Sequence, residues 1–163
     1  MRIFLLFVLL LLLTACSNGN RQEIDLSDRV VANPADGLGH YVYALSLPQQ
    51  VAPGELLSVE MDWRTVGPAD GRKRYALDVL LEGPARKVYP IRANENTVGE
   101  INLINWFGYS FPVPRDFPAG DYVLGVRLRD VAENDRVVTL GFDPELALAD
   151  GFYRVAGLKV VAP

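Results

Sequence analysis

Few side chains in this sequence are suited to catalysis. His40 is the only histidine among 163 residues, and neither a Gly-x-Ser-x-Gly nor a Ser-x-x-Lys pattern occurs. A Ser-His-Asp triad needs a histidine beside its nucleophile, and a zinc site needs several Cys, His or carboxylate ligands. The sequence therefore predicts a protein that is not an enzyme and that binds no cofactor.

Two aspartates are candidates for a catalytic pair. Asp62 and Asp78 fall in successive predicted strands, and glycoside hydrolysis needs two carboxylates on either side of the scissile bond. Ion pairing on a solvated face is the favoured interpretation, since exposed carboxylates usually pair with nearby bases. The bases near them in the sequence are Arg64, Arg72, Lys73 and Arg74.

A second group of carboxylates lies in one loop. Asp130, Glu133 and Asp135 offer oxygen ligands of the kind that calcium prefers. Their spacing is a poor match to a calcium-binding loop, and polar residues are expected in any turn. We therefore expect no metal site, with these three residues as the weak candidates.

The only cysteine, Cys16, has a clear chemical assignment. Arg2 and eleven apolar residues, Ile3 to Leu13, precede Leu13-Thr14-Ala15-Cys16. A positive charge, a short apolar run and small residues are typical of a secretory signal peptide, because a membrane span needs about 20 apolar residues. Leu13-Thr14-Ala15-Cys16 resembles the lipobox of bacterial lipoproteins. The resemblance implies that residues 1–15 are removed and that Cys16 carries two or three fatty chains, enough for stable anchoring.

The same resemblance bears on location and partners. Ser17 after the cysteine favours the outer membrane, facing the periplasm, and the inner membrane is the alternative. Removing residues 1–15 leaves 148 residues, which suits one domain, with 15 basic and 20 acidic residues. The resulting net charge of −5 argues against nucleic acid as a partner.

The segment after the cysteine is polar and rich in turn-forming residues. This composition predicts a flexible tether up to Gly39. We therefore expect three parts: residues 1–15 as the signal peptide, residues 16–39 as the lipidated N-terminus and tether, and residues 40–163 as the folded domain. An edge strand containing Ile24 and Leu26 is the alternative.

From His40 onward, apolar residues alternate with period two. The clearest runs are residues 57–64 and 75–82, which we expect to pair with each other. Further strands are expected at 101–103, 107–113, 122–129, 137–140 and 156–160. This pattern predicts an all-β protein, an antiparallel β-sandwich of seven to eight strands, with a barrel as the competing architecture.

Two strand entries point to a family of folds. Pro53-Gly54-Glu55 leads into a strand ending in Trp63, and Phe117-Pro118-Ala119-Gly120-Asp121 leads into Tyr122. Both are similar to strand entries in immunoglobulin-like and fibronectin type III-like bacterial modules. The resemblance implies a sandwich fold in which the Tyr122 hydroxyl bonds back across a corner. It implies no activity, because such sandwiches have many unrelated functions.

The aromatic segment Asn105–Tyr109 supplies the candidate binding residues, Trp106 and Tyr109. Exposed aromatic rings stack on sugars and anchor protein interfaces, although core packing is the alternative here. Two functions remain open: a lipid-anchored binding or scaffolding module for a protein of an envelope complex, and a carbohydrate-binding domain for polysaccharide. An unpaired apolar strand edge would favour the first, and an exposed coplanar aromatic pair would favour the second.

Overall fold

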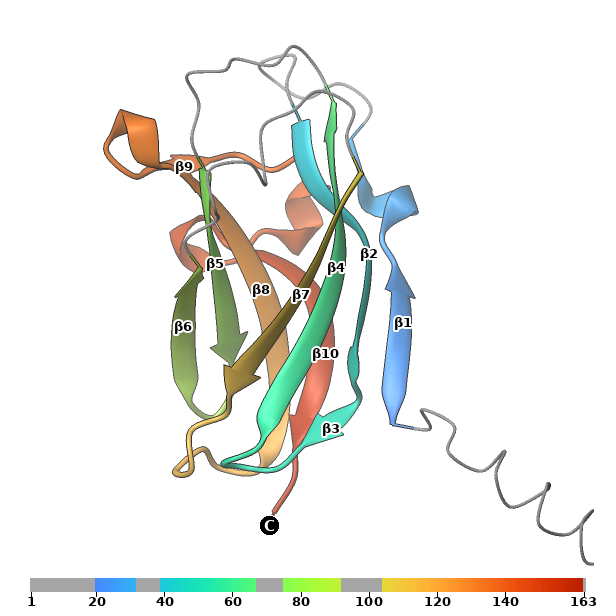
Figure 1. Cartoon of the computed structure of the whole chain (residues 1–163), viewed down its shortest axis with the longest axis vertical. Helices are drawn as coiled ribbons and strands as arrows, with labels where there is room; N and C mark the ends of the chain where they lie inside the picture. Colours follow the sequence, from blue (N-terminus) through green and yellow to red (C-terminus); the bar gives the residue numbers. More distant parts are fainter. Residues whose placement is uncertain (1–19, 32–38, 67–74, 92–103, 163) are drawn as a thin grey trace, which may run out of the picture.

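The computed structural model describes residues 20–31, 39–66, 75–91 and 104–162, with two sheets packed face to face (Figure 1). The first sheet has the order β1-β2-β4-β7, with β1 (Arg21–Asp25), β2 (Gly39–Pro48), β4 (Leu56–Val66) and β7 (Ile104–Pro112). The second has the order β3-β10-β8-β5-β6, with β3 (Gln50–Val51), β5 (Tyr75–Glu82), β6 (Arg86–Ile91), β8 (Gly120–Asp130) and β10 (Tyr153–Val160). A short strand, β9 (Arg136–Val138), also pairs with β8.

Short 3₁₀ helices complete the described fold. They are η1 (Ser27–Arg29), η2 (Val131–Glu133), η3 (Pro144–Leu146) and η4 (Ala149–Gly151). The segment with η3 and η4 runs over the outer face of the second sheet, where Leu148 approaches Gly125 and Phe152 is buried.

The connections between the sheets are those of an immunoglobulin-like sandwich. The chain crosses from one sheet to the other after β2, β3, β4, β6 and β7. Strands β2, β4 and β7 thereby face β10, β8, β5 and β6, and the neighbours within each of these two sets pair antiparallel. The prediction of an all-β antiparallel sandwich is confirmed.

The predicted pairing of residues 57–64 with 75–82 is wrong. β4 pairs with β2 and β7, whereas β5 pairs with β8 and β6 in the other sheet. Alternation shows that one face of a strand is buried, but both sheets bury a face in the same core. The alternation therefore does not predict which of the two sheets a strand joins.

The prediction of a flexible tether is also wrong for residues 21–25, because they form β1, an edge strand of the first sheet. All five of its residues pair antiparallel with β2, from Arg21 opposite Pro48 to Asp25 opposite Ala44. Leu26, just after the strand, is buried in the core. Burial of Ile24 and Leu26 outweighs the polar composition of the segment, as the edge-strand alternative anticipated.

The described residues contain ten strands rather than seven to eight. Besides β1, the additional strands are the two-residue β3 and the edge strand β6. β6 has Arg86, Lys87 and Pro90 among its six residues. Charge and proline are usual on edge strands, where they discourage pairing with other chains, and they obscure the alternation by which a strand is predicted.

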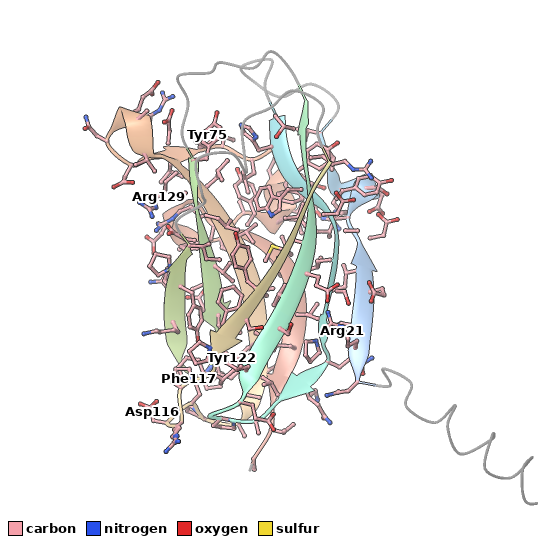
Figure 2. All side chains as sticks on the ribbon, in the orientation of Figure 1. Arg21, Tyr75, Asp116, Phe117, Tyr122 and Arg129 are labelled. Atoms are coloured by element: carbon pink, nitrogen blue, oxygen red, sulfur yellow. The ribbon has the colours of Figure 1, made fainter. Side chains whose placement is uncertain are left out.

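Tyr122 makes the expected corner bond. Its ring is buried and stacks on Phe117 at 5.4 Å, and its hydroxyl donates to the carbonyl of Pro118 at 3.0 Å. Figure 2 shows both rings at the end of the sandwich where β8 begins. The bond fixes the loop that enters β8.

Candidate functional site

A groove of about 470 Å³ lies on the side of the sandwich between β1 and β10. The edge strand β1 and the residue after it line one wall with Ile24 and Leu26, and β10 lines the other with Val155 and Ala156. Leu146, from η3, adds to this apolar lining. A shallower groove of about 340 Å³ continues along β1 and shares Gly157.

β10 has an open edge facing this groove. On one side it pairs with β8 from Tyr153 to Val160. On the other side, among the described strands, β3 pairs only with Lys159 and Val160, and a single bridge joins Tyr153 to Ala147. The stretch 154–158 between them therefore has no strand beside it in the described part of the chain.

Gly157 is at the centre of the open stretch. The N–H and C=O of a strand residue face one edge, and alternate residues face the same edge. Because the Lys159 N–H donates to the Gln49 carbonyl of the β2–β3 turn at 2.9 Å, Gly157 also faces outward from β8. Its carbonyl accepts from the side-chain amide of Gln22 at 2.7 Å, so a side chain occupies a place where a strand would bind.

Three charged residues line the groove: Arg29, Arg154 and Asp121, the last of which contacts Lys159 at 3.7 Å. Arg29 contacts Asp143 and Glu145 through Nη2, at 3.5 and 3.3 Å, while its buried Nε has no hydrogen-bond partner among the described residues. Arg154 is exposed and has no ion pair with another described residue. The groove thus combines apolar walls, an outward-facing strand edge and one arginine, Arg154, that has no ion pair among the described residues.

The predicted aromatic residues lie away from this groove, on β7. Tyr109 pairs with the core residue Val59, is half-buried, and stacks on Phe111 with ring centroids 6.1 Å apart. Burial raises the pKa of its hydroxyl. Tyr109 is therefore largely a packing residue. Trp106 pairs with Asp62 through its backbone, and its side chain lies outside the described part of the structure.

The three loop carboxylates do not converge on one point. Asp130 is buried and accepts from the Ala132 N–H at 3.0 Å, Glu133 pairs with Arg136 at 2.7 Å, and Asp135 pairs with Arg129. Across the described residues, no group of three or more His, Cys, Asp or Glu side chains is placed to hold a metal ion. Turn capping and ion pairing account for these residues.

Asp62 and Asp78 lie in different sheets, which argues against the hypothesis that they form a catalytic pair of carboxylates. Asp62, on β4, contacts Arg64 at 3.3 Å on the outer side of the first sheet. Asp78, on β5, belongs to the second sheet and is only 1% exposed. The sandwich core lies between the two faces.

Asp78 is held instead by two arginines of β8. Arg127 donates to it through Nε and Nη2 at 2.9 and 2.6 Å, and Arg129 through Nε and Nη2 at 2.8 and 2.9 Å. These hydrogen bonds raise the pKa of Arg129. Arg127 also donates to the Asp150 carbonyl at 3.0 Å and lies over the Phe152 ring. The cluster fastens the η3–η4 segment to the sheet.

His40 is buried at the end of the sandwich opposite the Tyr122 corner. It is 1% exposed, its Nδ1 lies 2.8 Å from the Thr65 hydroxyl, and the Tyr75 ring packs against it at 4.6 Å. Its Nε2 has no hydrogen-bond partner among the described residues. Burial lowers the pKa of the imidazole from 6.5 to about 4. His40 is thus a neutral packing residue.

Cys16 and residues 1–15, the predicted signal peptide, lie outside the described residues. No helix in the described ranges is long and apolar enough to cross a membrane. The groove was not predicted from the sequence, because it arises where edge strands from two sheets meet. The sequence feature that could have indicated the groove is the apolar pair Ile24 and Leu26 inside an otherwise polar segment.

The sequence matches no protein-family model and no curated protein. Among solved structures, the chain is similar to a CARDB domain from Pyrococcus furiosus that was crystallised in complex with di-metal ions. The TM-score is 0.41 and the identity 13%, and the alignment covers 77% of this chain and 94% of that chain.

Proposed function

We propose that this chain is a lipid-anchored, non-catalytic binding module of the bacterial cell envelope, and that it holds a partner protein by receiving an extended segment along the open edge of β10. The lipobox resemblance supports anchoring through Cys16, exposure to the periplasm, and the outer membrane as the location. The edge strand supports the mode of binding.

The single observation that carries the binding mode is the unpaired stretch 154–158 beside an apolar groove. An added strand gains main-chain hydrogen bonds from such an edge, and its alternate side chains enter the pockets beside it. The Gly157 N–H is a donor and its carbonyl an acceptor for an added strand. The added strand must first displace the Gln22 side-chain amide, which donates to that carbonyl.

The chemistry of the groove defines the segment that fits it. Ile24, Leu26 and Ala156 favour apolar residues at alternate positions. Arg154 on the rim favours a carboxylate beside them, since exposed charges direct register more than they add affinity. The ligand is therefore an extended, amphipathic segment of another protein, with a carboxylate opposite Arg154.

Anchoring is tested first. Replacing Cys16 by Ala removes the only thiol that can carry a diacylglyceryl group, so incorporation of labelled palmitate should fall to background. The protein should stall as a precursor at the inner membrane or, if another peptidase cuts it, appear in the soluble exported fraction. Ser17→Ala is the matched control and should keep the label. Palmitate incorporation that persists in Cys16→Ala would contradict the assignment.

Strand addition is tested by a photo-crosslinking residue at position 121, which lines the groove, in living cells. A crosslinked product should form there and disappear in Gly157→Pro, which removes the outward N–H while proline is tolerated on an edge strand. Gly157→Ala is the matched control, because it keeps the N–H and its Cβ would meet the nearest atom, the Tyr122 carbonyl oxygen, at 3.8 Å.

A second crosslinking site separates edge binding from general adhesion. Lys87 is exposed on β6, at the opposite edge of the second sheet, and should give no product that depends on Gly157. Products from position 121 that survive Gly157→Pro would rule out strand addition. Polysaccharide binding that Trp106→Ala abolishes and Gly157→Pro leaves intact would replace the proposal by the carbohydrate alternative.

A further inference from the structure

The chain enters the sandwich at a fixed point. The carbonyl of Asn20 accepts from the Gln49 N–H at 2.6 Å, and its side-chain amide donates to the Gln50 carbonyl at 3.2 Å. Gln49 lies between β2 and β3, and Gln50 begins β3, at the end of the molecule where β4 and β8 begin (Figure 1). The point of attachment is therefore part of the rigid fold.

The anchor is close to this point. Cys16 precedes Asn20 by four residues, and four fully extended residues reach about 14 Å. β8, with eleven residues, spans about 35 Å at roughly 3.3 Å per residue. A lipid on Cys16 thus holds one end of the sandwich near the headgroups, while the end with His40 and η2 lies a strand length farther away.

The end near the anchor exposes an apolar side chain that the fold does not need. Leu56, the first residue of β4, is 63% exposed, the highest value among the large apolar side chains of the described residues. Its neighbours are held in place, because Gly54 donates to the Val113 carbonyl and Val113 donates to the Glu55 carbonyl, both at 2.9 Å. Leu56 therefore projects from a rigid loop.

The charge of the loops at this end is small. Arg115 and Asp116 are adjacent and exposed, and with Glu55 they give a net charge of −1. A weak apolar contact is sufficient there, because the anchor already supplies a high effective concentration of the membrane surface.

We propose that this anchor-proximal end, formed by the loops around Leu56 and Asp116, faces the bilayer, and that Leu56 contacts the lipid headgroup region. The inference rests on the lipid anchoring of the proposed function and adds the orientation of the domain. The groove then opens beside the membrane rather than away from it. With β1 rising about 3.3 Å per residue, Ile24 lies within about 30 Å of Cys16.

Orientation is tested with the lipidated full chain reconstituted in vesicles of phosphatidylethanolamine and phosphatidylglycerol. Because lipidation consumes the Cys16 thiol, a cysteine introduced by Leu56→Cys takes up a bimane label selectively. Val131→Cys is the matched control at the far end, since Val131 is also an exposed apolar residue, 49% exposed. A headgroup spin-labelled phosphatidylcholine in the same vesicles acts as the quencher.

The label at position 56 should be quenched at least about twofold more strongly than the label at 131. Equal quenching at the two positions, or stronger quenching at 131, in protein that floats with the vesicles would overturn the orientation and leave anchoring intact. Failure of the mature protein to float would overturn the anchoring proposal and this inference together. The lipid-free domain, residues 17–163, should show no quenching at either position.

Discussion

Replacing Asp78 by Asn is expected to lower the free energy of unfolding by about 3–5 kcal/mol, the range for removing one partner of a buried ion pair. Asp78 accepts four hydrogen bonds from Arg127 and Arg129 and is almost fully buried. Asn preserves the shape but removes the charge. Two arginines that are each only about one-fifth exposed then lose their shared counter-ion.

Urea unfolding of the lipid-free domain measures the effect, with Asp150→Asn as the matched control. Asp150 pairs with Arg86 at 2.7 Å, but both side chains are about half exposed, so the control should cost no more than about 1 kcal/mol. A loss below about 1 kcal/mol in Asp78→Asn would show that water compensates the arginines. Replacing Asp78 by Leu together with both arginines by Met should recover much of the stability, because no unpaired buried charge remains.

The second large effect is a loss of stability in mild acid that depends on His40. Burial lowers the pKa of His40 to about 4 from its ordinary value of 6.5, so between these values the unfolded chain binds a proton that the folded protein excludes. The stability contribution of the neutral imidazole is complete above pH 6.5 and is lost as the pH falls toward 4. The total loss is about 3 kcal/mol, because each tenfold difference in proton affinity between the folded and unfolded chain corresponds to about 1.36 kcal/mol.

Denaturant unfolding at about pH 7 and about pH 4.5 measures this loss, and His40→Gln is the control. Gln retains a polar group for the Thr65 hydroxyl but does not titrate, so the histidine-dependent part of the pH slope should vanish. Because His40 is the only histidine, its ring resonances also report the pKa directly by NMR. A folded-state pKa near 6.5 would contradict the buried, unprotonated state.

The alternation of apolar residues correctly predicts which side chains of a strand are buried. Alternation in residues 57–63 places Leu57, Val59, Met61 and Trp63 on one face, and all four are buried in the core. The Tyr122 bond, which the resemblance of residues 117–122 to an immunoglobulin-like strand entry implies, is present and spans only four residues. The assignment of Tyr109 to binding was weaker, since the same alternation directs that residue inward.

The β1 segment shows where composition misleads. Asn, Asp and Gly around it indicated a flexible tether, yet two apolar side chains and a free edge on β2 are enough to form a strand. Whether a short segment forms a strand depends on whether the rest of the fold presents a free strand edge and a core surface beside it. That information is absent from the segment itself.

The class of fold could be predicted from the order of residues alone, because it depends on a local feature, the period of two along the strands. The lipidation of Cys16 stays a prediction from the residue types beside that cysteine. The choice of neighbouring strands, the meeting of Asp78 with Arg127 and Arg129, and the open edge of β10 facing β1 across a groove emerged only in the folded chain. The hydrogen bonds of Asp78, for example, join it to Arg127 and Arg129, which are 49 and 51 positions away in the sequence. Since hydrophobic burial is non-directional, it selects the faces of strands and leaves their partners to the packing of the whole chain.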